Sequence, residues 1–139
     1  MSPVPYIDSS VFLRYFLADD PVRSVASREL ILQLESGEAS AVTDRYVIFE
    51  VVFTLGRKAK LPKRSIQDAI GFLLLLPGLE IPDEALIRSA LALYVEKNIS
   101  FADAYICEMM ADSGIDRIYT WDSHFDRVPG IVRLTPGAE

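Results

Sequence analysis

A chain of 139 residues with a net charge of −6 at pH 7 excludes a surface that is basic throughout, so a polyanion would need a local basic patch or bridging cations. Half of the residues are apolar and 24% are charged, which excludes disorder and predicts a packed core. A single cysteine, Cys107, excludes an intrachain disulfide, and a single histidine, His124, excludes a nuclease that uses two histidines as acid and base.

The apolar segments of the chain are short. Residues 1–8 have no basic start and no apolar stretch of signal-peptide length. The longest apolar stretch, residues 69–79, is too short for a bilayer, which needs about 20 residues, and Pro77 interrupts it. We therefore expect a cytoplasmic protein without membrane contact.

Extended and helical segments alternate in the first half of the chain. Short strands are predicted at residues 4–7 and 39–43. They are followed by Asp8 and Asp44, which are suited to cap the helices after them. The helices predicted here cover residues 9–17, 22–35 and 45–59.

The second half continues the alternation. Further helices are predicted at residues 63–76, 82–97 and 100–113. Further strands are predicted at residues 79–81, 117–121 and 131–134, and the second of these ends at Asp122.

This alternation, without hairpin turn signals or a linker, predicts an α/β fold. We expect a single domain over residues 1–139, with a short, mainly parallel central sheet flanked by helices. Parallel sheets bind ligands beyond the carboxyl ends of their strands, which is where Asp8 and Asp122 are expected.

Glu50 is the only polar residue in residues 47–53, so its helix is expected to be largely buried. An unpaired carboxylate in such a helix would need a cation, a proton or a narrow route to water. The alternative is an exposed stripe of residues about one turn apart, formed by Tyr46, Glu50, Thr54 and Arg57. The two interpretations agree if the stripe lines a cleft.

The other candidate acids each have a structural alternative. Asp8 can cap a helix, Asp103 in Ser100-x-x-Asp103 resembles a capping box, and Asp122 can close a turn. Independent caps do not explain Glu50, however. Carboxylate oxygens that converge are typical of sites for hard cations such as Mg²⁺. We therefore interpret the four acids as one cluster.

The order of these acids resembles that of PIN domains, especially the VapC-type toxins of type II toxin–antitoxin pairs. Residues 6–14, Tyr-Ile-Asp-Ser-Ser-Val-Phe-Leu-Arg, resemble the opening of the family. Glu50 takes the place of a glutamate in a middle helix, Asp103 that of an aspartate at a helix start, and Asp122 that of an acid near Thr-x-Asp-x-x-Phe. The resemblance covers nearly the whole chain. Trp121 departs from it, because it is bulkier than the residue expected before the fourth acid.

The resemblance implies a PIN-like three-layer fold and a Mg²⁺- or Mn²⁺-dependent endoribonuclease, a phosphodiester hydrolase that cleaves single-stranded RNA. It also implies a homodimer and a VapB-like antitoxin partner. Under this hypothesis Asp8, Asp103 and Asp122 hold the metal, and Glu50 orients a water or shares in ligation. Ser9 and Thr120 are expected to hydrogen-bond the ligands from behind. Asp126, one turn after Asp122, is either a further acid of the site or part of a surface turn.

One dense basic cluster lies between two predicted helices, beyond Glu50, and it is our candidate contact to the RNA backbone. Its residues are Arg57, Lys58, Lys60, Lys63 and Arg64. A solvated helix end, favoured by the helix dipole, is the alternative. Arg14 is a second candidate because it follows the first acid.

A function from another class also remains open. The chain could be a catalytically silent PIN-like domain that binds protein or RNA. A competent acid cluster should gain thermal stability from metal, whereas a silent domain should gain little.

Overall fold

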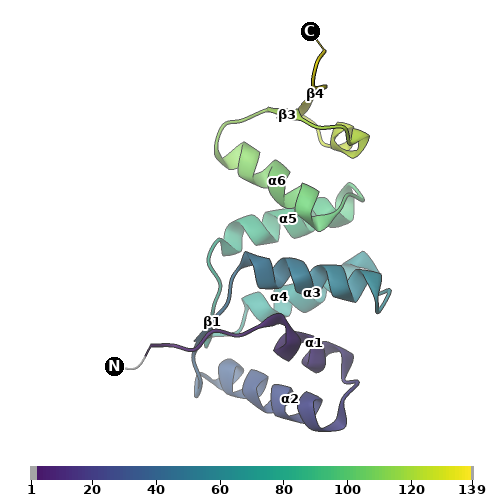
Figure 1. The fold of residues 1–139 in the computed structure, drawn as a ribbon. Coiled ribbons are helices and arrows are strands. Elements are labelled where there is room, and N and C mark those ends of the chain that lie inside the picture. Colours follow the sequence, from purple (N-terminus) through teal and green to yellow (C-terminus); the bar gives the residue numbers. More distant parts are fainter. Residues whose placement is uncertain (1–2, 139) are drawn as a thin grey trace. The chain divides into compact units, whose positions relative to one another are not determined.

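The computed structural model describes residues 3–138 (Figure 1). These residues form two compact units that divide between Glu84 and Ala85. Helices and short parallel strands alternate in it, which confirms the predicted α/β class. A single domain over residues 1–139 stays a prediction. In the described part of the chain, no helix is long and apolar enough to cross a membrane.

Three of the four helices of the first unit begin after an aspartate that caps them. The carboxylates of Asp8, Asp20 and Asp44 each accept hydrogen bonds from backbone amides in the first turn of the following helix, amides that have no partner within the helix. All four helices were predicted, and their ends differ from the predicted ends by at most two residues. They are α1 (Ser9–Leu17), α2 (Pro21–Ser36), α3 (Arg45–Arg57) and α4 (Lys63–Leu74).

The extended segments of the first unit run parallel to one another. β1 (Ala41–Val42) pairs with β2 (Leu79–Glu80), and Tyr6 forms an isolated parallel bridge to Val42. The backbone of β1 donates to Pro5 on one side and to Gly78 on the other, so β1 lies in the middle. These strands are shorter than predicted.

A core of fully buried apolar side chains joins the four helices of the first unit. The helices α1 and α2 pack against each other, and α3 packs against both α1 and α4 (Figure 1). The largest side chains of this core are Phe12, Ile31, Leu34, Ile48, Leu55, Ile66, Ile70 and Leu73.

The second unit contains two helices, a short 3-10 helix and one parallel strand pair. Its strands pair with Tyr119 opposite Leu134. The elements are α5 (Glu84–Glu96), α6 (Phe101–Asp112), β3 (Arg117–Tyr119), η1 (Ser123–Arg127) and β4 (Val132–Leu134). The predicted parallel sheet therefore takes the form of two parallel ladders in the described residues, one in each unit.

The end of β3 is the clearest local departure from the predicted elements. The predicted strand runs to Trp121, but β3 ends at Tyr119. The amide of Asp122 donates to the side-chain oxygen of Thr120 at 3.0 Å, which bends the chain at Trp121, and Asp122 then caps η1, a helix that the sequence did not predict. Local side-chain hydrogen bonds thus replace the last strand positions.

The Pro77-Gly78 turn provides a test of the packing in the first unit. A Cβ at Gly78 would collide with the backbone oxygen of Ala39 and lie 2.9 Å from that of Leu34. We expect Gly78→Ala to destabilise the fold by roughly 1–3 kcal/mol, because neither backbone segment can move aside easily. Urea unfolding measures the change.

Gly71 supplies the matched control, since it lies within α4 and a Cβ there meets nothing within 4 Å. Gly71→Ala should stabilise the fold by about 1 kcal/mol through helix propensity. Equal effects of the two substitutions would contradict the close approach at Gly78.

Candidate functional site

Two aspartates follow neighbouring extended segments at one edge of the first unit. Tyr6 and Val42 form a parallel bridge. The residues two positions further on, Asp8 and Asp44, therefore occupy corresponding places on two neighbouring segments. Both follow an extended segment and precede a helix. The buried hydroxyl of Thr43 donates to the carbonyl of Ile7 at 3.0 Å. This hydrogen bond joins the two segments just before the acids.

The carboxylate of Asp8 is exposed and held by local donors. Its Oδ2 accepts from the hydroxyl of Ser10 at 2.8 Å and from the amide of Ser10 at 3.3 Å. These hydrogen bonds lower the pKa of Asp8, with the Ser10 hydroxyl contributing most. The hydroxyl of the buried residue Ser9 lies 3.5 Å from Oδ1, and its role as a supporting residue stays a prediction.

Asp44 is an acid that the sequence interpretation treated only as a cap. Its Oδ1 accepts from the amides of Tyr46 and Val47 at 2.9 and 3.3 Å. Burial raises the pKa of Asp44, but the Tyr6 hydroxyl and these amides outweigh that effect and lower it overall. The signal in the sequence was that Asp44 follows its strand as Asp8 follows the first one.

Glu50 lies on the exposed face of α3. Its neighbours at one-turn spacing, Tyr46 and Arg57, are exposed too, whereas Thr54 is half-buried. The exposed-stripe interpretation therefore describes this face better than burial does. The guanidinium of Arg45 lies over the ring of Tyr46, with 5.1 Å to the ring centroid.

In the second unit, the structure brings Asp103 and Asp122 together. Asp103 is half-buried in the first turn of α6, and Asp122 precedes η1. Burial raises the pKa of Asp103, and the nearby carboxylate of Asp122 adds to this rise, while the Ser100 hydroxyl opposes it. The capping interpretation also holds, because the Ser100 hydroxyl accepts from the Asp103 amide at 3.1 Å.

His124, which entered the sequence analysis only as the single histidine of the chain, lies beside Asp122. Its Nδ1 is 3.3 Å from Oδ1 of Asp122, and its amide donates to the same oxygen at 2.8 Å. His124 also lowers the pKa of Asp103 to a small extent. No sequence pattern marked this residue, because a single histidine in a turn is common.

The predicted supporting residues of the second unit differ in their surroundings. Thr120 accepts from the amide of Asp122, so it fixes the backbone next to the acid. Both oxygens of Asp126 accept from Arg133 at 3.1 Å, and this pairing lowers the pKa of Asp126. Asp126 is therefore engaged in an exposed ion pair.

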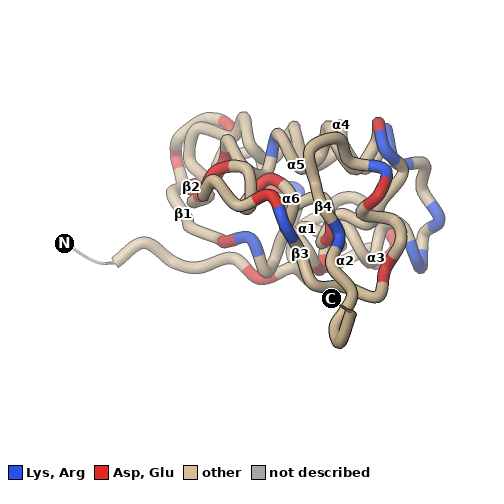
Figure 2. Tube along the Cα trace, turned by 90° about the horizontal axis from the view of Figure 1, so that it is seen from above, with Lys and Arg blue, Asp and Glu red and all other residues tan. Residues whose placement is uncertain are grey.

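The predicted basic cluster lies at the end of α3 and the start of α4, where Figure 2 shows blue segments of the tube gathered. All of its members are exposed except Lys63, which is half-buried. Arg14 is half-buried and forms an ion pair with both oxygens of Asp19 at 3.1 Å. It also lines a pocket of about 530 Å³ between α1 and α3 that includes Lys58.

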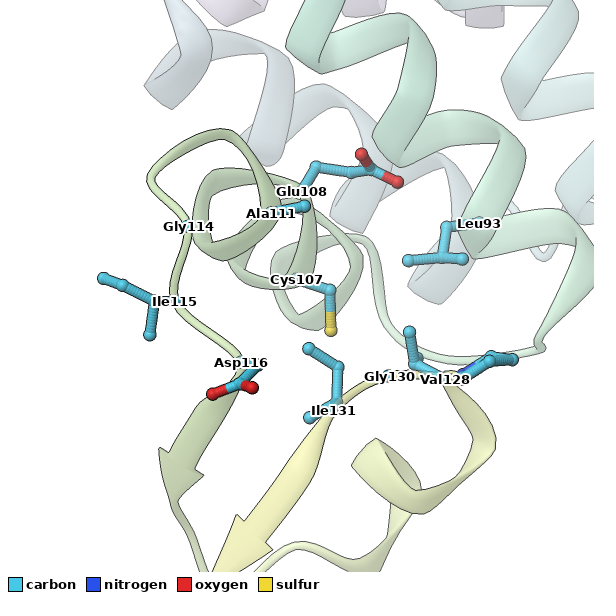
Figure 3. Close-up of a pocket in the computed structure, with 11 residues that line it drawn as sticks. Leu93, Cys107, Glu108, Ala111, Gly114, Ile115, Asp116, Val128, Gly130 and Ile131 are labelled. Atoms are coloured by element: carbon cyan, nitrogen blue, oxygen red, sulfur yellow. The ribbon is translucent and has the colours of Figure 1, made fainter.

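A hollow of about 510 Å³ in the second unit lies beside Cys107 (Figure 3). The thiol points toward Ile131, and Glu108 and Asp116 line the same hollow. Cys107 is buried, as expected for a core residue, and burial raises the pKa of its thiol. This hollow includes none of the four predicted acids.

The four acids are thus divided between the units, with Asp8 and Glu50 in the first and Asp103 and Asp122 in the second. Within either unit, over residues 3–138, no group of three or more His, Cys, Asp and Glu side chains is placed to hold a metal ion. The structure supplies one acidic pair in each unit, and convergence of all four predicted acids stays a prediction.

The raised pKa of Asp103 predicts how stability depends on pH. Ionised Asp103 costs stability once the pH exceeds the pKa of the unfolded chain, and the cost is complete above the folded pKa. Asp103→Asn should therefore raise the melting temperature at pH 7 and leave it nearly unchanged at about pH 3, below the ordinary range of aspartate.

Asp8 provides a control of opposite sign, because its pKa is lowered in the folded chain. Its ionised form adds stability above the unfolded pKa, and this gain is lost as the pH falls through the folded pKa. Asp8→Asn should lower the melting temperature at pH 7. If Asp103→Asn also lowered it there, the crowding of the Asp103 carboxylate would be refuted.

Comparison with known proteins adds a family to this geometry. Proteins of curated function yield no match to the chain. The PIN domain profile, however, matches residues 6–131, which include both acidic pairs and Glu50. PIN domains are generally nucleases and generally use divalent metal ions. The chain therefore belongs to the PIN domain family.

Proposed function

We propose that the chain is a metal-dependent endoribonuclease that hydrolyses phosphodiester bonds in single-stranded RNA. The observation that supports this most is the half-buried Asp103 beside Asp122, in a chain of the PIN domain family. The negative charge of Asp122 raises the pKa of Asp103, because two neighbouring carboxylates repel each other. A bound cation would remove this repulsion. In the first unit, Asp8 and Asp44 also present carboxylate oxygens where extended segments end.

The donor set fits Mg²⁺ or Mn²⁺, because both prefer oxygen ligands. Asp8, Asp103 and Asp122 would hold the metal. When bound, it would supply an activated water and stabilise charge on the phosphate. The hydroxyls of Ser9 and Thr120 and the amide of His124 keep the acids oriented. Exposed Glu50 would orient the attacking water.

We further propose that the chain is the toxin of a type II toxin–antitoxin pair. In this proposal it acts in the cytoplasm as a homodimer, and a VapB-like antitoxin restrains it. The support is the resemblance of the chain to VapC-type toxins in the order of its acids. A catalytically silent PIN-like domain that binds protein or RNA is the alternative.

The nuclease proposal is tested by incubating the purified chain with mixed cellular RNA, with Mg²⁺ or Mn²⁺ or with EDTA, and mapping new RNA ends. We expect new ends only with metal. Asp8→Asn and Asp103→Asn should each slow cleavage by roughly 100-fold or more. Asp68→Asn in α4 and Asp112→Asn in α6 each remove the charge of an exposed aspartate. These variants are the matched controls, and we expect them to keep full activity.

A metal titration of thermal stability separates the two candidate functions. A metal concentration of 100 times Kd stabilises a folded protein by about 2.7 kcal/mol. We expect such a gain in the wild type and its loss in Asp103→Asn. No gain, together with no metal-dependent RNA ends, would favour the silent domain.

The basic cluster is tested by the salt dependence of RNA binding. Lys60→Gln combined with Arg64→Gln should reduce the slope of log K against log salt by about 0.7 for each phosphate that the variant no longer neutralises. Arg23→Gln combined with Arg28→Gln, on α2, changes the net charge equally and should leave the slope nearly unchanged. Equal slopes for both variants would indicate that the cluster is a solvated helix end.

A further inference from the structure

Trp121 is the only tryptophan of the chain, and its side chain is 75% exposed. Tryptophan is highly buried on average in folded proteins, because its ring contributes so much apolar surface. Tyr119, two residues earlier, is 71% exposed. Trp121 is not among the described residues that contact another ring or a cation.

The exposure of Trp121 follows from a fixed backbone. Thr120 accepts a hydrogen bond from the amide of Asp122, and Asp122 accepts one from the amide of His124. The first of these hydrogen bonds spans Trp121, where the backbone bends, and the second fixes the backbone that follows it. The ring is therefore presented to solvent by an ordered turn.

The position of the indole links it to the acidic pair. Trp121 directly precedes Asp122, and consecutive Cα atoms are about 3.8 Å apart, so the backbone carries the indole and the acid on adjacent residues. Proteins that bind single strands commonly stack bases on exposed aromatic rings. A chain with a net charge of −6 gains little from long-range attraction to RNA, so contacts to bases carry more of the binding.

We propose that Trp121 stacks on a nucleobase of single-stranded RNA, next to the phosphate that a cation at Asp103 and Asp122 would hold. This inference rests on the proposed nuclease function and assigns a substrate contact to it. The residues next to Trp121 in the sequence, Thr120, Asp122, Ser123 and His124, are polar, and the exposed apolar surface nearby in sequence is that of the Tyr119 ring. Such a setting suits a single flat base better than a second copy of the chain, which would need a broad apolar patch.

The fluorescence of Trp121 reports directly on this contact, since no other tryptophan contributes. The full chain is titrated at low salt, in EDTA, with a single-stranded oligoribonucleotide of mixed sequence. We expect quenching of the emission. In a binding assay with a labelled oligonucleotide, Trp121→Ala should weaken affinity by roughly fivefold to 100-fold. Trp121→Phe, which keeps an aromatic face, should weaken it less.

Ile115→Ala is the matched control, because Ile115 is a 53% exposed apolar residue of the same unit. It should leave affinity unchanged. The stacking proposal is overturned if the wild type shows no quenching, or if Trp121→Ala and Ile115→Ala bind equally well. It is also overturned if the emission shifts with protein concentration alone, since a second copy would then cover the ring.

The design separates this proposal from the nuclease itself. Binding in EDTA requires no hydrolysis, so quenching without any cleavage in Mg²⁺ would keep the base contact and refute the enzyme. Cleavage in Mg²⁺ with no quenching in EDTA would support the enzyme and refute the base contact at Trp121. In an active enzyme, Trp121→Ala should raise KM more than it lowers kcat, because the ring binds the base and does not touch the reacting atoms.

Discussion

The parallel pairing of the chain around Tyr6 with β1 is the constraint on which the acidic edge of the first unit depends. A one-residue change of register would turn alternate side chains to the opposite face. The buried hydroxyl of Thr43, bonded to the Ile7 carbonyl, holds the register in place. Asp8 and Asp44 are neighbours because of this alignment, although they are far apart in sequence.

The structure also removes a conflict between capping a helix and binding a ligand. In Asp44 and Asp122, one oxygen, Oδ1, receives the capping hydrogen bonds from backbone amides. In Asp8 the short hydrogen bonds go to Oδ2, and Oδ1 has only the Ser9 hydroxyl at 3.5 Å. An aspartate can therefore start a helix with one oxygen and present the other to a cation.

Local signals in the sequence were enough to predict nearly all helices and the acids that cap them. They gave the wrong end for β3 and left the role of Asp126 open, at two places where side-chain hydrogen bonds decide the structure. The pairing of Asp126 with Arg133 joins the 3-10 helix to β4, and the bend at Trp121 depends on the Thr120 hydroxyl. The exposure of Glu50 was undecided for a related reason, because an apolar helix does not reveal which of its faces stays open.

The protein stabilises the charge of the carboxylates to different extents in the two units. Hydrogen-bond donors lower the pKa of both Asp8 and Asp44, so the charge of these carboxylates is already stabilised by the protein. Burial and Asp122 raise the pKa of Asp103, whose charge is stabilised least. A divalent cation would therefore relieve the greatest electrostatic cost at Asp103 and Asp122. Under the proposed function, the same cation would lower the negative charge beside Trp121 and so add to the binding that base stacking provides without metal.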